Sequence, residues 1–312
     1  MKNDTTKNRI AVIGANGFIG QALSAELIKR GYNINSIVRK IDANRSFFKK
    51  IDKIDKDTNW NNVLENVKTI IYCAGIAHNK LKNKNDLKSD YEDISIDGIK
   101  NLVKQAAHLG VQKFIFISSI GVNGKDSFYP LTENSPYKTN NMYSNYKKKT
   151  ELLLLDLSKI YEIEFLIVRP PLVYAKNAPG NFNSLIKLIE TGLPLPFKLI
   201  KNKRSFIALD NIVDFIILIS SSTKLKKSRY EIFLISDDEC FSTPELIYKI
   251  AEKINKKVIL FPMPVFFLKV ILIVCFKSRL IPSILNSLVI DNSKAKKKYG
   301  WKPVTNLDKQ LN

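Results

Sequence analysis

Three side chains in the middle of the chain have types and spacing that suit proton transfer: Ser119, Tyr143 and Lys147. Tyr143 and Lys147 are four residues apart, so on a helix they lie on the same face. A tyrosine ionises near pH ~10, and an adjacent ammonium group favours its phenolate form. Tyr143 can then accept a hydroxyl proton while a hydride leaves the same carbon, and Ser119 can hydrogen-bond the same oxygen. The trio predicts hydride transfer at a carbinol or carbonyl carbon.

A glycine-rich turn near the start of the chain could hold the hydride carrier. Gly14, Gly17 and Gly20 are spaced three residues apart, directly after the apolar run 10–13. Glycine has no Cβ and lets the backbone approach a ligand closely. A helix that begins near Phe18 would present free N–H groups and its positive end to a diphosphate. We interpret the turn as a dinucleotide-binding strand–helix turn, with an ordinary strand–helix turn as the alternative.

Apolar runs that alternate with helical patterns must position these residues. This alternation predicts an α/β fold, a doubly wound parallel sheet of Rossmann type, whose ligands bind at the carboxyl edge of the sheet. We expect residues 1–170 to form the dinucleotide-binding Rossmann core. Residues 171–312 should be mainly a smaller, C-terminal substrate-binding region, interleaved with the last strands. The predicted strands are 9–13, 33–38, 69–74, 113–118 and 165–168, and the predicted helices are 18–30, 90–109 and 143–161.

The end of the second predicted strand bears on the choice of cofactor. An acidic residue there usually binds the ribose 2′-hydroxyl of NAD, whereas an arginine accommodates the 2′-phosphate of NADP. Arg39 and Lys40 stand at this place. They favour NADP, with NAD as the alternative if both residues belong to an exposed lysine-rich loop.

The composition excludes some classes of function. The net charge of +21 is suited to nucleic-acid binding, but only eight of the fifty basic residues are Arg and the lysines are spread along the whole chain. No basic stripe with interleaved aromatic residues stands out, so we predict no nucleic-acid partner. Cys73, Cys240 and Cys275 lack metal spacing, which predicts no metal site and a reduced, cytoplasmic location. The polar start of the chain predicts no secretory signal.

The segment 265–276 is the most apolar part of the chain. It is shorter than the ~20 residues that a membrane span needs, and Lys269 stands near its centre. We predict a buried or partly exposed helix and no transmembrane span. The alternative is weak peripheral membrane contact through this segment together with Lys277 and Arg279.

The motifs together resemble one known family, the extended short-chain dehydrogenases/reductases, also called the NAD-dependent epimerase/dehydratase family. Some of the motifs look like a bacterial branch that acts on UDP-linked N-acetylhexosamines in surface-polysaccharide synthesis. The motifs that carry the resemblance span nearly the whole chain: 14–20, Tyr72-Cys-Ala-Gly75, 116–124, 143–147, Val168-Arg-Pro-Pro-Leu-Val-Tyr174, Gly192-Leu-Pro-Leu-Pro196, Arg204-Ser-Phe-Ile, Ser242-Thr-Pro-Glu-Leu246, Ser293-Lys-Ala and Tyr299-Gly-Trp301.

The resemblance implies roles for individual residues. Ser119, Tyr143 and Lys147 match the catalytic trio, and Lys147 would also reach the nicotinamide ribose. Residues expected to bind the cofactor are Gly14, Gly17, Phe18, Ile19, Gly20, Arg39, Lys40, Ala74, Gly75, Ile76, Tyr143, Lys147 and Pro171. Residues expected to bind the substrate are Asn123, Asn181 and Arg204, of which the last two match positions that hold the diphosphate of a sugar nucleotide.

Two reactions and one non-catalytic role fit these expectations. We favour a cytoplasmic reductase that acts on C4 of a UDP-4-keto-6-deoxy-N-acetylhexosamine, because a reductase must exchange its cofactor and Arg39 suits NADPH. The alternative is a 4-epimerase of UDP-glucose or UDP-N-acetylglucosamine, which regenerates its nicotinamide in each turnover. A second alternative is a non-catalytic NADP-binding sensor or assembly factor. A homodimer is also compatible with the resemblance.

Overall fold

The computed structural model describes residues 9–39, 48–75, 96–222 and 228–311. The chain divides into two compact units, which are described one at a time. The first unit consists of 1–122, 139–169 and 213–233, and the second consists of 123–138, 170–212 and 234–312. The cofactor-binding role of 1–170 and the substrate-binding role of 171–312 stay predictions.

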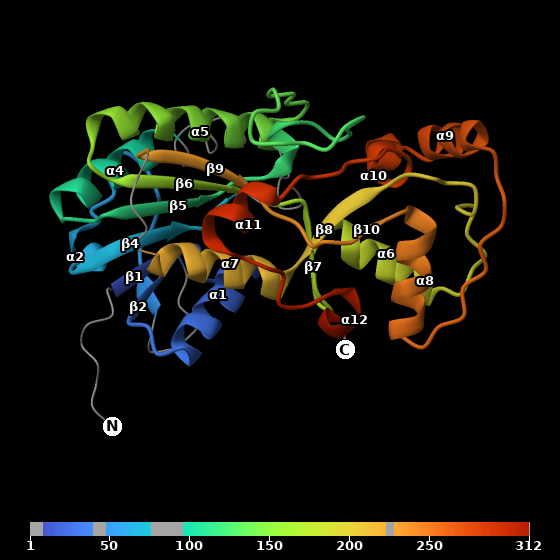
Figure 1. Cartoon of the computed structure of the whole chain (residues 1–312), viewed down its shortest axis with the longest axis horizontal. Coiled ribbons are helices and arrows are strands. Elements are labelled where there is room, and N and C mark those ends of the chain that lie inside the picture. Colours follow the sequence, from blue (N-terminus) through green and yellow to red (C-terminus); the bar gives the residue numbers. More distant parts are fainter. Residues whose placement is uncertain (1–8, 40–47, 76–95, 223–227, 312) are drawn as a thin grey trace. The chain divides into compact units, whose positions relative to one another are not determined.

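A seven-stranded sheet in the order β3-β2-β1-β4-β5-β6-β9 forms the centre of the first unit (Figure 1). The pairings from β3 through to β6 are parallel. Strand order reverses beside β1, which is the arrangement of a doubly wound sheet and confirms the predicted fold class. The strands are β1 (Arg9–Ile13), β2 (Ile34–Val38), β3 (Phe48–Lys50), β4 (Val67–Tyr72), β5 (Lys113–Ile117), β6 (Glu164–Arg169) and β9 (Tyr230–Leu234).

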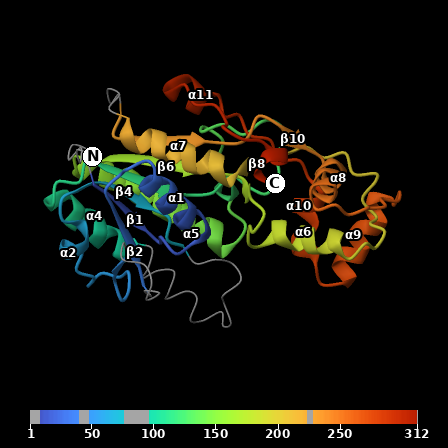
Figure 2. The ribbon, with the colours of Figure 1, turned by 90° about the horizontal axis from the view of Figure 1, so that it is seen from below.

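Helices cover both faces of this sheet. Figures 1 and 2 show α4 and α5 on one face and α1 and α7 on the other. The predicted helix 90–109 begins at Gly98 within the described residues, and positions 90–95 lie outside them. The helical elements are α1 (Phe18–Lys29), α2 (Asn61–Leu64), α4 (Gly98–His108), the short 3-10 turn η2 (Ile120–Val122), α5 (Met142–Ile160) and α7 (Leu209–Ser221), whose residues from Val213 belong to this unit.

One part of the core of the first unit lies between the sheet and helices α4 and α5, and Leu23 and Leu27 of α1 are buried on the other face. A strand that is buried on both faces usually has an almost continuous run of apolar residues. Strand β5 (Lys-Phe-Ile-Phe-Ile) fits this rule, because it is buried at every position. On α4, Ile99, Leu102 and Ala106 recur at helical spacing and are fully buried against the strands. These apolar contacts pack the helices on the sheet, and the candidate site lies at the carboxyl ends of its strands.

The second unit contains a three-stranded sheet in the order β10-β8-β7. Asp237 ties its parts together, because its carboxylate accepts hydrogen bonds from Tyr174 Oη (2.5 Å) and Asn211 Nδ2 (2.6 Å). Burial raises the pKa of Asp237 above its ordinary value, while these hydrogen bonds act in the opposite direction. The elements are β7 (Leu172–Tyr174), α6 (Asn181–Glu190), β8 (Arg204–Ala208), β10 (Cys240–Phe241), α8 (Thr243–Lys253), α9 (Val265–Val274), η3 (Ser278–Leu280), α10 (Ile281–Leu285), α11 (Ser293–Tyr299) and α12 (Leu307–Gln310).

The apolar segment near the C-terminus forms helix α9, as predicted, but little of it is buried. Leu268 and Leu272 are its buried residues, whereas Phe266 is 70% exposed and Phe267 is 57% exposed. Across the described part of the chain, no helix has the length and apolarity that crossing a membrane requires.

A buried ion pair joins α5 to β6 in the first unit. Arg169 donates to Glu151 through Nη2 (2.5 Å to Oε2) and through Nε (3.1 Å to Oε1), and both side chains are at most 1% exposed. Ser118, directly after β5, donates a third hydrogen bond to Glu151 Oε1 (2.5 Å). Breaking a buried pair leaves an uncompensated charge, so the arrangement requires all of its members.

We predict that Glu151→Leu lowers the free energy of unfolding by about 3–5 kcal/mol, because Arg169 would stay buried without its counter-ion. Urea denaturation measures this change. The double variant Glu151→Leu/Arg169→Met should recover most of the loss, since it removes both charges. The matched control is Glu162→Leu, which breaks an exposed pair with Arg229 and should change stability little. Equal effects of Glu151→Leu and Glu162→Leu would contradict the prediction.

Candidate active site

The glycine turn brings β1 and α1 against the end of β4. Gly14 has φ 84°, and a Cβ on it would lie 2.7 Å from the backbone nitrogen of Ala74. A Cβ on Gly20 would collide with the carbonyl oxygen of Gly14. No L side chain fits at either position without moving the backbone, so the two glycines set the close packing of the turn.

The first turn of α1 is open to an anion. Its N-cap residue is Gly17, which has no side chain to cap the helix, and the first turn contains no acidic residue. The N–H groups of Phe18, Ile19 and Gly20 therefore stand at a helix N-terminus whose positive end no side-chain carboxylate of that turn compensates. This is the geometry that binds a phosphate group.

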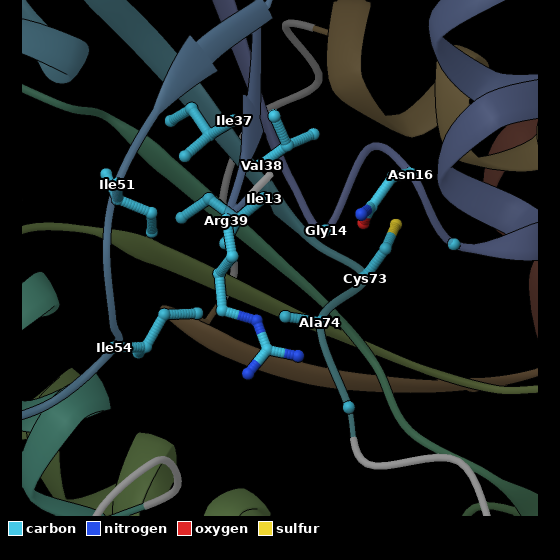
Figure 3. Close-up of a pocket in the computed structure, with 12 residues that line it drawn as sticks. Ile13, Gly14, Asn16, Ile37, Val38, Arg39, Ile51, Ile54, Cys73 and Ala74 are labelled. Atoms are coloured by element: carbon cyan, nitrogen blue, oxygen red, sulfur yellow. The ribbon is translucent and has the colours of Figure 1, made fainter. Parts of the chain in front are cut away.

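A pocket opens between this turn and the ends of β2 and β4 (Figure 3). It holds about 620 Å³ of empty space, part of it open to solvent. Five of the predicted cofactor residues line it: Gly14, Gly17, Arg39, Ala74 and Gly75. The other lining residues are Ile13, Asn16, Ile37, Val38, Ile51, Ile54 and Cys73, most of which form an apolar wall.

Sequence reasoning did not find that wall. Ile37 is the residue before the end of β2, and Ile51 and Ile54 follow β3, a three-residue strand with two lysines that has no clear strand pattern. An isoleucine that follows an unrecognised strand gives no signal of its own. Two further predicted cofactor residues, Lys40 and Ile76, lie outside the described residues.

Among the described residues that line the pocket, Arg39 has the one charged side chain. Figure 3 shows its guanidinium group pointing into the pocket, away from the apolar side chains Ile37 and Val38. It follows β2 directly, where the sequence predicted a residue that distinguishes the two dinucleotides. The exposed guanidinium can approach a ligand without first breaking a buried contact.

Tyr143 and Lys147 lie on one face of α5, as their spacing predicted. The Lys147 Nζ atom lies 5.8 Å from the centre of the Tyr143 ring and 4.5 Å from the centre of the Phe116 ring. It donates a hydrogen bond to the carbonyl oxygen of Ile117 (2.7 Å), the last residue of β5. Asn141 and Ser144 form a capping box that fixes the residue at which α5 begins.

Ser119 lies in the turn that follows β5, in the same unit. Its Oγ accepts a hydrogen bond from the backbone N–H of Gly121 (3.1 Å). A Cβ on Gly121 would lie 3.3 Å from Ser119 Oγ and 4.0 Å from the Cβ of Ser144, the neighbour of Tyr143. The turn that carries Ser119 therefore packs on the first turn of α5, and all three trio residues belong to one corner of the first unit.

Burial controls the charge of Lys147. Removal from water lowers the pKa of its ammonium group to about 8, and the nearby Cys73 and Glu151 oppose that shift. Glu151 lies one helical turn beyond Lys147, a position that sequence reasoning did not single out. The signal was available, because Glu151 continues the i, i+4 series that Tyr143 and Lys147 begin.

Cys73 lies on the other side of this lysine and also lines the pocket. Burial raises the pKa of its thiol to about 12, although the ammonium group of Lys147 favours the thiolate. The thiol is therefore neutral near pH 7, and it adds no charge to the pocket.

Four predicted residues, Pro171 for the cofactor and the three substrate residues, belong to the second unit. Pro171 is buried, and in the sequence it stands between β6 and β7. Asn123 is 1% exposed and donates through Nδ2 to the carbonyl oxygens of Ser135 (2.8 Å) and Pro136 (3.2 Å). Their roles toward ligands stay predictions.

The other two substrate candidates differ in exposure. Asn181 is the exposed first residue of α6, whose N-cap is Gly180 at φ 79°. Arg204 is half-buried, and its Nη1 donates to the carbonyl oxygens of Pro282 (2.9 Å) and Asn286 (2.7 Å). Burial lowers the pKa of Arg204 to about 10, so it keeps its charge at neutral pH. The sequence did not indicate that this guanidinium also holds α10 in place.

Comparison with known proteins confirms the resemblance found in the sequence. The model of the NAD dependent epimerase/dehydratase family matches residues 10–234. A UDP-glucose 4-epimerase of Vibrio cholerae is 31% identical over 94% of this chain and 90% of its own length. The N-acetyl-alpha-D-glucosaminyl-diphospho-ditrans,octacis-undecaprenol 4-epimerase of Escherichia coli O157:H7 is 26% identical over 80% of this chain and 74% of its own length.

A solved structure shows the same fold. UDP-glucuronic acid 4-epimerase from Bacillus cereus, in complex with UDP-glucuronic acid and NAD, superposes with a TM-score of 0.77 over 97% of this chain and 96% of that chain, at 21% identity. The family match extends from the glycine turn through β9 and includes the whole trio. By its sequence and its fold, the chain belongs to the NAD dependent epimerase/dehydratase family of enzymes.

Proposed function

We propose that the protein transfers a hydride to or from C4 of a UDP-linked hexosamine, with a nicotinamide dinucleotide held in the pocket of the first unit. The observation that carries the proposal is that Ser119, Tyr143 and Lys147 belong to the same unit as a glycine-walled pocket at the ends of β1, β2 and β4. A dinucleotide pocket and a proton-transfer trio are the two parts that such a reaction needs.

The residues present fit a dinucleotide. Gly14 and Gly20 leave no room for side chains between the turn and its neighbours, and the uncapped start of α1 suits a diphosphate. The wall formed by Ile37, Ile51 and Ile54 suits the apolar face of an adenine ring. Such a cofactor, when bound, supplies the acceptor or donor of the hydride.

The trio handles the proton. Tyr143 accepts the proton of the C4 hydroxyl during oxidation and returns it during reduction. Lys147 favours the phenolate of Tyr143 while it is an ammonium ion, and its hydrogen bond to Ile117 holds it in place. Ser119 donates to or accepts from the same substrate oxygen, which keeps that oxygen facing Tyr143. Pro171, Asn123, Asn181 and Arg204 are proposed to contact the ligands from the second unit.

The relatives support 4-epimerisation as the first candidate reaction. The Vibrio cholerae relative covers nearly the whole chain and is a UDP-glucose 4-epimerase, and the Escherichia coli relative is also a 4-epimerase. The name of the latter describes an N-acetylglucosaminyl group that a diphosphate joins to a polyprenol. A sugar attached to a diphosphate is the feature that these substrates share, and it suits an arginine such as Arg204.

Reduction of a 4-keto-6-deoxy sugar is the second candidate, and Arg39 is the observation that favours it. A guanidinium that points into the pocket after β2 suits the 2′-phosphate of NADPH, which a reductase consumes and must exchange. The solved UDP-glucuronic acid 4-epimerase contains NAD, which supports NAD as an alternative cofactor in this proposal. A cytoplasmic location and a role in surface-polysaccharide synthesis stay predictions.

Turnover tests the proposal directly. The protein is incubated with UDP-N-acetylglucosamine and NAD and, separately, with a UDP-4-keto-6-deoxy-N-acetylhexosamine and NADPH or NADH. Interconversion of the gluco and galacto forms without net change of cofactor indicates an epimerase, whereas stoichiometric loss of reduced cofactor with the keto sugar indicates a reductase. Binding of the cofactor without turnover of any of these sugars would support the non-catalytic alternative and overturn the proposal.

We predict that Tyr143→Phe lowers kcat by about 100- to 10,000-fold on whichever sugar the protein turns over, because the proton acceptor is lost. Isothermal titration should show nearly unchanged cofactor binding. The matched control is Tyr248→Phe, a change at an exposed tyrosine of α8 that should leave kcat unchanged. Full activity of Tyr143→Phe would remove the proton-transfer role from this residue.

Arg39→Asp should change cofactor preference. The carboxylate repels the 2′-phosphate of NADP and accepts a hydrogen bond from the 2′-hydroxyl of NAD, so we predict that the ratio of the Kd for NADP to the Kd for NAD rises about tenfold or more. Lys56→Asp, at an exposed lysine outside the pocket lining, controls for the change in net charge. The same shift in both variants would show that Arg39 makes no specific contact.

The lowered pKa of Lys147 predicts a pH dependence. The phenolate of Tyr143 is stabilised only by the ammonium form, so kcat/KM should fall as the pH rises through about 8. Lys147→Arg should move this descending limb to higher pH, because a guanidinium keeps its proton there, even if its absolute rate is lower. Lys149→Arg, at an exposed neighbour on α5, is the control and should leave the profile unchanged. An unchanged limb in Lys147→Arg would contradict the assignment.

A further inference from the structure

Helix α9 exposes an apolar surface that none of the described residues of the second unit covers. A helix that is apolar around its whole circumference is normally buried in a protein core or in a membrane. On α9 the exposed fractions are 70% for Phe266, 57% for Phe267, 57% for Ile273 and 68% for Val274, and Phe276 just beyond the helix is 96% exposed. We use the name "α9 surface" for the exposed side chains of Phe266, Phe267, Val270, Ile271, Ile273, Val274 and Phe276.

The fold holds this surface in a defined position. Leu268 and Leu272, one turn apart, are buried, and α9 contacts α10. Figure 1 shows α9 beside α10. The segment that contains α10 is fixed in turn, because Asn202 and Arg204 donate to the carbonyl oxygens of Ile284, Pro282 and Asn286. The α9 surface is therefore part of the folded unit and belongs to no frayed end.

The backbone at Phe276 departs from the usual end of a helix. Phe276 has φ 56°, in the left-handed region that glycine favours at this position. The N–H of Phe276 donates to the carbonyl oxygen of Ile273 (3.0 Å), and the N–H of Lys277 donates to the carbonyl oxygen of Leu272 (2.8 Å). These two hydrogen bonds cap the C-terminus of α9. An aromatic residue here costs more backbone energy than a glycine would, and it exposes a large apolar side chain.

The chain segment that carries the α9 surface contains basic residues and no acidic ones. Between residues 253 and 290 the chain contains no Asp or Glu, whereas it contains Lys253, Lys256, Lys257, Lys269, Lys277 and Arg279. Lys269 lies on α9, and Lys277 and Arg279 lie in the segment that follows it; these three side chains are exposed. Exposed aromatic side chains together with basic residues are the combination that binds the interface of an anionic bilayer.

We infer that the α9 surface docks the protein onto an anionic lipid bilayer, with Phe266, Phe267 and Phe276 in the interface and Lys269, Lys277 and Arg279 facing the lipid phosphates. The inference goes beyond the proposed function and holds whatever sugar the enzyme uses. A symmetric contact with a second copy would place two such basic segments against each other without a carboxylate between them. An anionic bilayer supplies the opposite charge that the segment itself lacks.

Vesicle flotation of the full chain tests the inference, with phosphatidylglycerol/phosphatidylcholine vesicles as the anionic probe and phosphatidylcholine vesicles as the neutral one. The protein should float with the anionic vesicles and much less with the neutral ones, and high salt should weaken its binding. Phe266→Ser/Phe267→Ser should lower the partition coefficient about tenfold or more. The matched control is Phe128→Ser/Tyr129→Ser, a change at two residues that are 104% and 83% exposed elsewhere in the same unit.

Two further pairs of variants test whether a loss of vesicle binding comes from the α9 surface itself. The first pair controls for changes in stability, and the second controls for changes in net charge. Phe276→Gly should raise the thermal midpoint while it lowers vesicle binding, whereas Asn255→Gly, at the equivalent left-handed position after α8, should leave vesicle binding unchanged. Lys277→Glu/Arg279→Glu should lower binding more than Lys297→Glu/Lys302→Glu does.

Equal binding of both serine double variants, or equal binding to anionic and neutral vesicles, would overturn the inference. Sedimentation without lipid supplies another decisive outcome. A stable oligomer that Phe266→Ser/Phe267→Ser dissociates, in a protein that ignores vesicles, would assign the α9 surface to a second copy instead.

Discussion

The candidate site depends on one carboxylate that has no access to water. Glu151 lies on α5 and binds Arg169 at the end of β6 and Ser118 after β5, so it connects a helix to two neighbouring strands at the edge where the trio stands. Lys147 and Tyr143 precede it by one and two helical turns. Their height above the sheet is therefore set by a charge pair whose separation would be very costly, since neither ion can be left alone in the core.

This arrangement also explains how a lysine can be kept in the core. The Nζ atom of Lys147 donates a hydrogen bond to the carbonyl oxygen of Ile117 and lies 4.5 Å from the centre of the Phe116 ring. The carboxylate of Glu151 is one helical turn away. Desolvation lowers the pKa of Lys147, Cys73 and Glu151 act in the opposite direction, and desolvation is the larger effect. The ammonium group of Lys147 therefore releases its proton more readily than that of a surface lysine. It lies beside Tyr143, whose phenolate it is proposed to stabilise.

Much of this could be predicted from the sequence, because the relevant signals are local. The run Ile10–Ile13 followed by spaced glycines specifies a strand, a tight turn and a helix, and the pair Tyr143 and Lys147 needs only the helical repeat. The rest is set by contacts between distant residues. β3 has three residues, two of them lysines, so its place at the sheet edge follows from pairing with β2 rather than from its own pattern. The exposure of α9 could not be predicted either, because an apolar run does not reveal whether the fold supplies a partner for it. The carbonyl partners of Arg204 come from residues 282 and 286, far along the chain.

Cys73 illustrates what burial does to a reactive group in the wall of a pocket. Alkylating agents and peroxides react with thiolates, and the oxidation ladder from sulfenic to sulfonic acid begins from that form. A thiol whose pKa is about 12 is almost entirely protonated under physiological conditions, even though its sulfur borders the pocket. The wall of the pocket thus includes a cysteine whose thiol is held in the protonated form, which reacts more slowly than the thiolate.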